Sequence, residues 1–361
     1  MTSEVNMNGR LSRAVACGLL RATLAAACCS APARAQSLDQ LYAMAKPEKS
    51  LILSAGGPAA SYETAARAFE QKFPGIAVSL TDGFSNVLGA RVEEQVQTGR
   101  METDVVILHT IQNFARWADR GALVPFKPDG FDKVGRSFRD GNGRWIAVST
   151  HPIFYGYNSE RVPQWEVPKL AIDFLRPQLK GKLVSGYPAD DDASLFAFTT
   201  IVRKYGWGFM AQYMRQEPKF VQGHLDVARS LGSGESLLSF DMTAGSAVVA
   251  REAGGKIGLA GPVDDFLPVV FFAEAILKDA PHPNAAKLFA AWLLSKEWQS
   301  RSGAYSPRSD VPPPAGLPTI SNYRIEDRYL EFVTGGEDQL ADLRRRFESY
   351  TGPVVNVGGV R

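Results

Sequence analysis

The sequence contains few cysteines, and none of them lies beyond the first 35 residues. Cys17, Cys28 and Cys29 are the three cysteines of the chain. Residues 36–361 therefore offer no disulfide, no thiolate nucleophile and no sulfur-ligated metal site. Function classes that depend on a thiol are excluded for this part of the protein.

The first 35 residues have the pattern of an export signal. Arg10 and Arg13 give a positive start, and two apolar runs follow at residues 14–20 and 22–29. A small-residue stretch then ends at Ala35, as at a signal-peptidase site. We expect cleavage after Ala35, so that residues 1–35 are a signal peptide and the mature chain is periplasmic.

Two other interpretations of this leader stay open. A retained membrane anchor would need about 18 continuous apolar residues, and Arg21 interrupts the run before either half reaches that length. Lipidation of Cys28 is the second alternative. It is weakened because the residue three positions earlier is Ala25 rather than leucine.

The mature chain also lacks an excess of charge and a long apolar run. The whole sequence has 40 basic and 38 acidic residues, and the leader contains four of the arginines and one glutamate, which leaves 36 basic and 37 acidic residues. Nucleic-acid binding requires a basic stripe, which this balance does not favour. The apolar run at 266–277 is too short to span a membrane and contains Glu274.

Recognisable catalytic motifs are missing as well. The sequence has no HExxH motif and no phosphate-gripping P-loop, and residues 83–87 lack the final glycine of GxSxG. A secreted hydrolase with catalytic residues dispersed along the chain remains the enzyme alternative. We expect a protein that is not an enzyme and uses no cofactor.

Residues 36–361 are too many for one hydrophobic core, so two lobes are expected. Short apolar runs alternate with helical periodicity, which is typical of α/β lobes built on mostly parallel sheets. Strands are predicted at 51–53, 76–80, 105–108, 182–185, 257–260 and 269–277, helices at 61–73, 85–97, 193–205, 223–231 and 243–253, and core-facing helical stripes at 285–293 and 340–350.

The chain passes between the lobes near His151-Pro152. Extended apolar runs at 145–149 and 153–157 flank this dipeptide. Because proline cannot donate a ladder hydrogen bond, the strand must leave one sheet here and enter another. Gly261-Pro262 is the second predicted crossing, after which residues 269–277 return to the first sheet.

These two crossings divide the mature chain into lobes. Residues 36–150 and 266–361 are predicted to form lobe 1, and residues 151–265 are predicted to form lobe 2. The hinge is expected near residues 149–151 and Gly261-Pro262.

The crossover and its flanking segments resemble those of bacterial extracellular solute-binding proteins, in the group that includes ferric-ion, phosphonate, thiamine and polyamine binders of ABC importers. The segments that carry the resemblance, in order along the chain, are residues 104–108 (DVVIL), 121–128 (GALVPFKP), 180–185 (KGKLVS), 218–220 (PKF) and 280–294 (APHPNAAKLFAAWLL). The resemblance implies a two-lobed periplasmic-binding-protein fold of type II, joined by two crossover strands. It also implies a monomer that captures a small solute and delivers it to the membrane subunits of an ABC permease.

Candidate ligand-binding residues follow the strands, because ligands of open α/β sheets bind beyond the carboxyl ends of the strands. Glycines after the first strand let the backbone approach a ligand, and the start of the second helix attracts anions. Each feature also has a purely structural explanation that involves no ligand. These explanations are a tight turn for the glycines, a helix cap for the serine or asparagine, and a hydrogen-bonded loop residue for the histidine. In lobe 1 the rule selects Ser54, Gly56, Gly57, Ser85, Asn86, His109 and Thr110.

In lobe 2 the candidates are one tyrosine and a group of acids. Tyr155 shares a strand face with Tyr157, and this face could equally be core. Among Asp190, Asp191 and Asp192, one is expected to cap the following helix, while the excess negative charge suits a cationic group or a hard metal ion. Asp241 is a further candidate, whose alternative role is to cap its own helix.

These two groups of residues predict the charge of the solute. Glycine amides and helix starts favour an anionic group, and the four aspartates favour a cationic one, so a zwitterion or an amine-bearing anion would satisfy both. A ferric ion is the alternative, but ferric-binding relatives carry consecutive tyrosines where this chain has Phe240-Asp241. The histidines His151, His224 and His282 are scattered in sequence, so no metal site is predicted.

Overall fold

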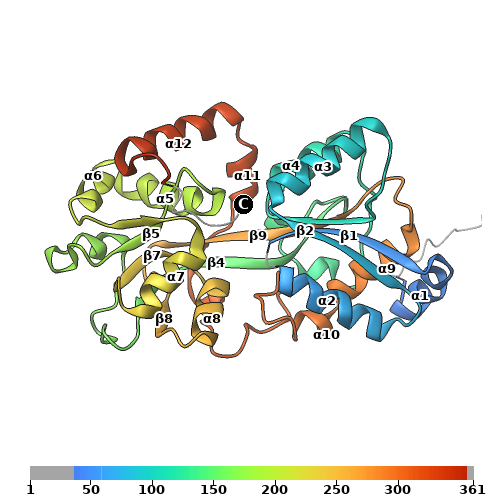
Figure 1. The fold of residues 1–361 in the computed structure, drawn as a ribbon, viewed down its shortest axis with the longest axis horizontal. Coiled ribbons are helices and arrows are strands. Elements are labelled where there is room, and N and C mark those ends of the chain that lie inside the picture. The colour runs from blue at the N-terminus through green and yellow to red at the C-terminus, as the bar shows by residue number, and fades with distance from the viewer. Residues whose placement is uncertain (1–35, 58, 356–361) are drawn as a thin grey trace, which may run out of the picture. The chain divides into compact units, whose positions relative to one another are not determined.

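Two long strands cross the middle of the computed structural model of this chain, which describes residues 36–57 and 59–355 (Figure 1). The strands are β4 (Ile146–Asn158) and β9 (Phe266–Ile276), and they are antiparallel. Their ladder runs from Ile146 opposite Glu274 to Pro152 opposite Val269.

The other elements alternate along the chain as the sequence pattern predicts. The described strands besides these two are β1 (Ser50–Gly56), β2 (Ala77–Gly83), β3 (Val105–Leu108), β5 (Val184–Gly186), β6 (Lys219–Val221), β7 (Leu238–Thr243), β8 (Ile257–Ala260) and β10 (Arg324–Glu326). The described α-helices are α1 (Leu38–Ala45), α2 (Ala59–Lys72), α3 (Ser85–Thr98), α4 (Ile111–Asp119), α5 (Asp192–Tyr205), α6 (Gly208–Met214), α7 (Gly223–Ser233), α8 (Ala244–Glu252), α9 (Pro283–Leu293), α10 (Lys296–Gln299), α11 (Tyr329–Thr334) and α12 (Glu337–Thr351).

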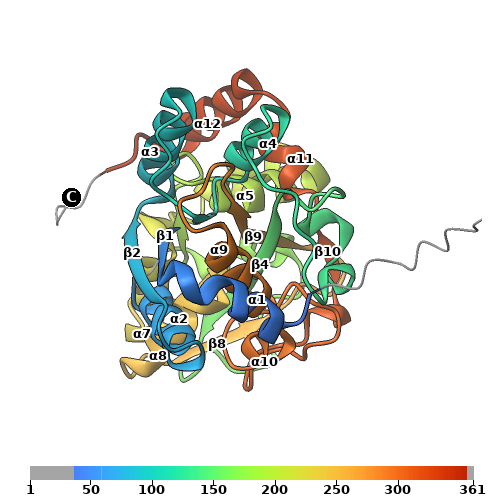
Figure 2. The same cartoon turned by 90° about the vertical axis from the view of Figure 1, so that its right-hand side faces the viewer.

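The first part of the sheet has the strand order β2-β1-β3-β9-β4. β1 is parallel to both β2 and β3, as predicted, whereas β9 is antiparallel to β3 and β4. Helices α1, α2 and α9 lie together against this part of the sheet (Figure 2). Phe69 of α2 packs edge-on against Phe289 and Trp292 of α9, so these large rings fill the core between helices and sheet.

β4 exchanges its partner strands where the sequence predicts a crossing. Up to Pro152 it pairs with β9, and from Ile153 it pairs with β7, while Tyr155 to Asn158 pair with β8. The predicted crossing at His151-Pro152 therefore coincides with the change of ladder. The second crossing lies within β9 itself, which pairs with β10 at Phe266 before it joins β4 and β3.

The second part of the sheet is mixed rather than mostly parallel. β7 and β8 are both antiparallel to β4, and the parallel pair β5–β6 forms a separate two-stranded sheet. The crossover strand enters from lobe 1 in the direction opposite to that of its new neighbours, which explains the difference from the predicted parallel sheet.

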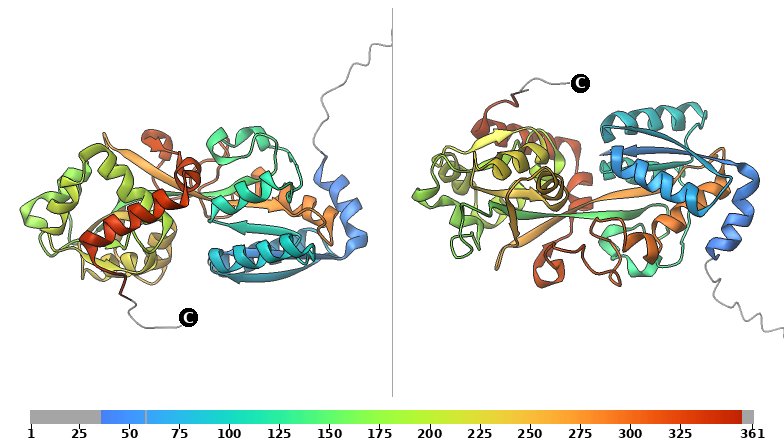
Figure 3. Two further views of the ribbon diagram at one scale, coloured as in Figure 1. Left: turned by 90° about the horizontal axis from the view of Figure 1, so that it is seen from above. Right: turned by 60° about the horizontal axis from the view of Figure 1, so that its bottom comes forward.

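The C-terminal helix corrects the predicted lobe boundary. Trp207 stacks on Tyr350 and contacts Phe347, and Arg344 forms an ion pair with Asp192 at the start of α5. Figure 3 shows α12 beside the elements of residues 151–265. The packing of α12 therefore associates it with lobe 2, although residues 266–361 are predicted to belong to lobe 1. The amphipathic stripe of α12 predicts that it packs on a core, but it does not identify which core.

The predicted signal peptide, residues 1–35, lies outside the described residues. Within residues 36–57 and 59–355, no helix combines the length and the apolar character that crossing a membrane requires.

Candidate functional site

Two glycines bring the ends of β1 and β2 close to the start of α3. A Cβ atom on Gly56 would lie 2.1 Å from the Ser85 hydroxyl oxygen, so only glycine permits this approach. The buried Ser85 hydroxyl in turn accepts the backbone N–H of His109 at 3.3 Å. Ser85 thus connects α3 to the loop after β3. It does not cap its helix, because the N-cap position belongs to Phe84.

Gly57 lies against an aromatic ring of the second crossover strand. Its φ of +123° is unfavourable for residues with a side chain, and a Cβ would lie 3.2 Å from the ring of Phe272. The Gly57 N–H donates to Gly83 at 3.1 Å and is therefore not free for a ligand. Neighbouring Phe84 has 75% of its surface exposed at the start of α3, and Asn86 is exposed as well.

Two histidines contact the Phe272 ring. The rings of His109 and Phe272 meet edge-on with 5.5 Å between centroids, and those of His151 and Phe272 meet with 5.0 Å. His109 follows β3 directly, His151 lies on β4 and Phe272 lies on β9. A loop of lobe 1 and both crossover strands therefore meet at one aromatic ring.

The surroundings of His151 keep its imidazole neutral. The Ser149 hydroxyl lies 3.0 Å from Nε2 of His151. Burial, with a smaller contribution from positive charge on His109 and His224, lowers the pKa of His151 to about 4.

His224, at the start of α7, has the opposite surroundings. Its Nε2 lies 2.9 Å from a carboxylate oxygen of Asp241, and its Nδ1 lies 3.8 Å from Asp191. Burial alone would lower the pKa of His224, but the carboxylates of Asp241 and Asp191 outweigh burial and raise this pKa to about 9. His224 is therefore an imidazolium at neutral pH.

Asp241 connects four elements of lobe 2. This fully buried carboxylate on β7 accepts the N–H of Gly186 at 3.1 Å and the Ser194 hydroxyl at 2.8 Å, in addition to binding His224. The alternative role of Asp241 as a cap of α8 is wrong, since the N-cap of that helix is Thr243. Asp241 acts on the site through His224 because its own side chain has no exposed surface.

We call His109, His151, Phe272 and His224 the histidine site. Of the four histidines, His109 and His151 contact the same Phe272 ring, whereas His224 is paired with Asp241 and Asp191. His282 is paired with Asp104 at 2.9 Å. Within the described residues, no group of three or more histidines, cysteines or acids has the geometry to hold a metal ion. The histidine site is therefore a set of hydrogen-bonding and charged groups rather than a preformed metal cage.

Three predicted ligand-binding residues are buried. Ser54 belongs to β1 and is buried, since the strand continues to Gly56. Thr110 is buried too, and its hydroxyl accepts the side-chain amide of Asn113 in α4. Tyr155 packs edge-on against Phe174 in the core of lobe 2. Thr110 and Tyr155 thus have partners within the fold, and the roles of all three residues in ligand binding stay predictions.

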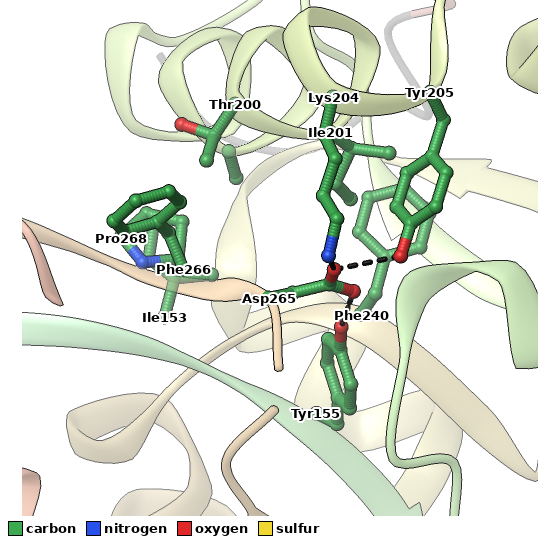
Figure 4. A pocket seen from close by; sticks show the side chains of 11 residues that line it. Ile153, Tyr155, Thr200, Ile201, Lys204, Tyr205, Phe240, Asp265, Phe266 and Pro268 are labelled. Atoms are coloured by element: carbon green, nitrogen blue, oxygen red, sulfur yellow. Dashed lines mark hydrogen bonds and ion pairs between the residues drawn. The ribbon is translucent and has the colours of Figure 1, made fainter. Parts of the chain in front are cut away.

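Tyr155 belongs to a separate cluster around Asp265 (Figure 4). The Asp265 carboxylate accepts the hydroxyls of Tyr155 at 3.2 Å and Tyr205 at 2.7 Å, the N–H of Ala171 at 2.6 Å and the ammonium group of Lys204. The cavity beside this cluster has a volume of about 20 Å³, which fits a water molecule but not a solute. Since Asp265 directly precedes β9, the cluster fixes the second crossover strand to α5.

The three adjacent aspartates have separate roles. Asp191 is the N-cap of α5 and accepts the N–H groups of Ala193 and Ser194, which confirms the predicted cap. Asp192 is occupied by its ion pair with Arg344. Asp190 is exposed and accepts only a side-chain N–H of Gln222, at 3.2 Å. Of these three aspartates, only Asp190 has an exposed carboxylate that could bind a cationic group of the solute.

Sequence reasoning missed His151, His224 and Phe272 as members of one site. His151 stands next to the proline that marks the crossing, and His224 stands at a helix start, so position in the fold was the available signal. Metal-ligand spacing, the criterion applied to these histidines, could not detect groups that meet only in three dimensions.

Comparisons with known proteins agree with the fold described above. The family model of a bacterial extracellular solute-binding protein matches residues 64–319. An Fe(3+)-binding periplasmic protein of Serratia marcescens is 20% identical over 281 residues, which cover 73% of this chain and 83% of the relative.

Two solved structures share the fold. The iron-bound HitA of Pseudomonas aeruginosa matches with a TM-score of 0.68 and 20% identity, over 82% of this chain and 99% of that structure. The periplasmic binding protein AfuA of Actinobacillus pleuropneumoniae, with fructose-6-phosphate bound, matches with a TM-score of 0.65 and 18% identity, over 83% and 98% of the two chains. At these identities the likeness concerns the fold.

Proposed function

The chain belongs to the bacterial extracellular solute-binding protein family and is a solute-binding protein of an ABC transporter, and from this premise we propose that it captures one small solute at the histidine site, between the two lobes. The loaded protein then delivers the solute to the membrane subunits of its permease. Residues 1–35 act as a cleaved export signal, and the mature chain works in the periplasm as a monomer without enzyme activity.

The meeting of both lobes at the histidine site carries this proposal. His109 comes from a loop of lobe 1, His224 comes from a helix of lobe 2, and His151 and Phe272 lie on the two strands that join the lobes. A solute that contacts all four would bind better when the lobes are closed than when they are open. Differential contact of this kind is what shifts a hinge equilibrium.

The charges at the site support a solute with an anionic group. The N-terminus of α3 favours negative charge, whereas the imidazolium of His224 is already paired with the carboxylates of Asp241 and Asp191. The predicted zwitterion remains our proposal in a reduced form. Asp190 alone would hold the cationic end, because Asp191, Asp192 and Asp241 already have partners.

Phe272 and exposed Phe84 add apolar surface near these charges. Such surface suits the carbon skeleton of an organic solute more than a bare inorganic ion. We therefore propose a small organic anion or zwitterion.

A ferric ion is the second candidate, because the Serratia relative is an Fe(3+)-binding protein. Iron binding is disfavoured by Phe240-Asp241, the residues that stand where the ferric-binding relatives carry consecutive tyrosines. Phe240 packs among Phe198, Phe209 and Tyr213 in the core and has no phenolate oxygen. The next residue, Asp241, already accepts three hydrogen bonds.

The test begins with the mature chain, residues 36–361, purified without denaturation. Mass spectrometry of the retained ligand is expected to identify an organic anion or zwitterion, whereas bound iron would overturn the choice of solute class. Small-angle scattering with and without that compound is expected to show compaction. If no compound from a broad panel of anions, zwitterions, cations and neutral sugars binds or compacts the protein, the receptor function itself is wrong.

One further measurement separates a receptor from the hydrolase alternative. A receptor is stabilised in a thermal-shift assay by a compound that is recovered unchanged. Conversion of the bound compound into products would instead show an enzyme.

A further inference from the structure

The four histidines of the chain fall into two classes. His224 and His282 each lie within hydrogen-bonding distance of an aspartate. His109 and His151 have no such partner, since within the described residues no carboxylate forms an ion pair with either ring. Their neighbours are instead the Ser149 hydroxyl, the Phe272 ring and each other's positive charge.

The absence of a carboxylate beside His109 and His151 matters because of where these two histidines lie in the fold. His151 occupies the point where β4 exchanges β9 for β7, and His109 occupies the end of β3. A positive charge on His151 meets the charges of His109 from lobe 1 and of His224 from α7. The carboxylates of Asp191 and Asp241 face this region from α5 and β7, but His224 binds both of them.

Within residues 36–57 and 59–355, no carboxylate is paired with His151 to compensate a proton on its ring. An anion between the lobes would compensate it, because that anion would face His109, His151 and His224 at once. Ligand binding that favours the protonated form of a group must, by linkage, be accompanied by proton uptake.

We propose that His151 takes up a proton from solvent when an anionic solute enters the histidine site, so that the protein captures anion and proton together. The inference rests on the proposed solute-binding function and specifies how the site recognises charge. The proton adds to the free ring nitrogen of His151, and no bond of the solute is broken. His109 sets how readily this happens, because its charge opposes that of His151.

This assignment predicts a definite dependence of affinity on pH. Protonation of His151 is unfavourable in the free protein near neutral pH, since burial lowers the pKa of this ring to about 4. Anion affinity is expected to rise as the pH falls from 7.5 to 5. The limit is about tenfold per pH unit for one proton taken up.

The test uses ligands whose own charge is constant in this range. Glucose 6-sulfate and inorganic sulfate are the anionic probes, glucose is the neutral control, and glycine and putrescine represent zwitterions and cations. Isothermal titration calorimetry at pH 5, 6 and 7.5, in pairs of buffers with different ionisation enthalpies, gives both the affinity and the number of protons taken up. We expect uptake to accompany the sulfates and not glucose.

Three variants assign the proton. His151→Gln is expected to abolish proton uptake and flatten the pH dependence, and His109→Gln is expected to move uptake to higher pH by removing one opposing charge. His282→Gln, at the histidine outside the site, is the matched control and should behave like the wild type. Thermal melting of each variant verifies folding, and His151→Asn provides a second substitution at that position.

The outcomes separate this inference from the proposed function. Binding of a sulfate with no proton uptake, or with the same pH dependence in His151→Gln, would overturn the inference and leave the receptor function intact. Binding of only glucose or putrescine would also overturn it while a receptor remained. Failure of every probe to bind counts against the receptor function together with the inference.

Discussion

His224 and His151 belong to the same site, yet their surroundings favour opposite states of charge. His224 has Asp241 and Asp191 beside it, and its pKa rises to about 9. His151 has a serine, an aromatic ring and two other histidines around it, and its pKa falls to about 4. Both rings are largely but not fully withdrawn from solvent, so burial does not distinguish them. The carboxylates behind the ring decide its charge.

This difference gives the two lobes distinct tasks. Lobe 2 presents a positive charge that is fixed and already compensated from behind. The crossover strand β4 presents the neutral ring of His151 beside the Phe272 ring of β9. Under the proposal made above, this ring becomes charged only when an anion binds.

The largest expected effect on the contrast between His224 and His151 comes from removing the buried carboxylate of Asp241. Asp241→Ala leaves the imidazolium of His224, the N–H of Gly186 and the hydroxyl of Ser194 without their partner. We expect the free energy of unfolding at pH 7 to fall by about 3 to 5 kcal/mol, measured by urea denaturation. The matched control, Asp190→Ala at an exposed carboxylate, should cost less than about 0.5 kcal/mol. Equal losses in the two variants would contradict the buried ion pair.

Raising the pH should reveal the contribution of charged His224 to the free energy of unfolding. The folded-state pKa of about 9 lies above the ordinary value of 6.5, so the stabilisation is complete below pH 6.5 and is lost as the pH rises through 9. The shift corresponds to roughly 3 kcal/mol between those pH values. Urea denaturation of the wild type and of His224→Gln from pH 6 to 10 measures this loss. A parallel pH dependence in both proteins would rule out the proposed role of His224.

Lowering the pH should have the opposite effect through His151. Its folded-state pKa of about 4 lies below 6.5, so the unfolded chain binds the proton first, and the protein loses stability as the pH falls from 6.5 towards 4. We expect about 2 kcal/mol, less than the full shift implies, because the ring retains some contact with solvent. His151→Gln should lose less stability than the wild type over this range. If the two curves coincide, His151 is not the neutral ring described here.

Sequence patterns predicted the framework of this molecule well, because its causes are local. β3 and β8 agree with the predicted ranges at both ends, and the crossing at His151-Pro152 follows from the one residue that cannot donate a ladder hydrogen bond. Asp191 caps α5 as its place between a strand and a helix indicates. Strand alternation, caps and proline act over a few residues and are visible in sequence.

The site was predicted less well, since its contacts are distant in sequence. Ser54, Thr110 and Tyr155 stand beside strand ends but point into the fold, and a sequence does not reveal which way a side chain at a strand end turns. His109 and His151 share the Phe272 ring only because β4 passes beside β9 at this point. The packing of α12 on lobe 2 was missed for the same reason: an apolar stripe does not specify its partner.

The smallest effect is expected for Tyr155, which lies outside the histidine site and should not influence the binding of the solute. Tyr155→Phe removes one hydrogen bond to Asp265, which keeps its contacts with Lys204 and Tyr205. We expect a loss of about 1 kcal/mol in the free energy of unfolding and no change in solute affinity. Thermal melting and calorimetry with the identified solute measure both quantities. A fivefold weaker solute affinity in this variant would show that Tyr155 does contribute to solute binding.

The titration of the individual histidine rings tests the central claim most directly. Ring-proton NMR spectra of the mature protein from pH 3.5 to 10, assigned with the four His→Gln variants, give one midpoint for each histidine. The account predicts a midpoint near 9 for His224 and near 4 for His151. Midpoints near 6.5 for both rings would show that the two lobes do not hold their histidines in opposite states of charge, and would contradict the account.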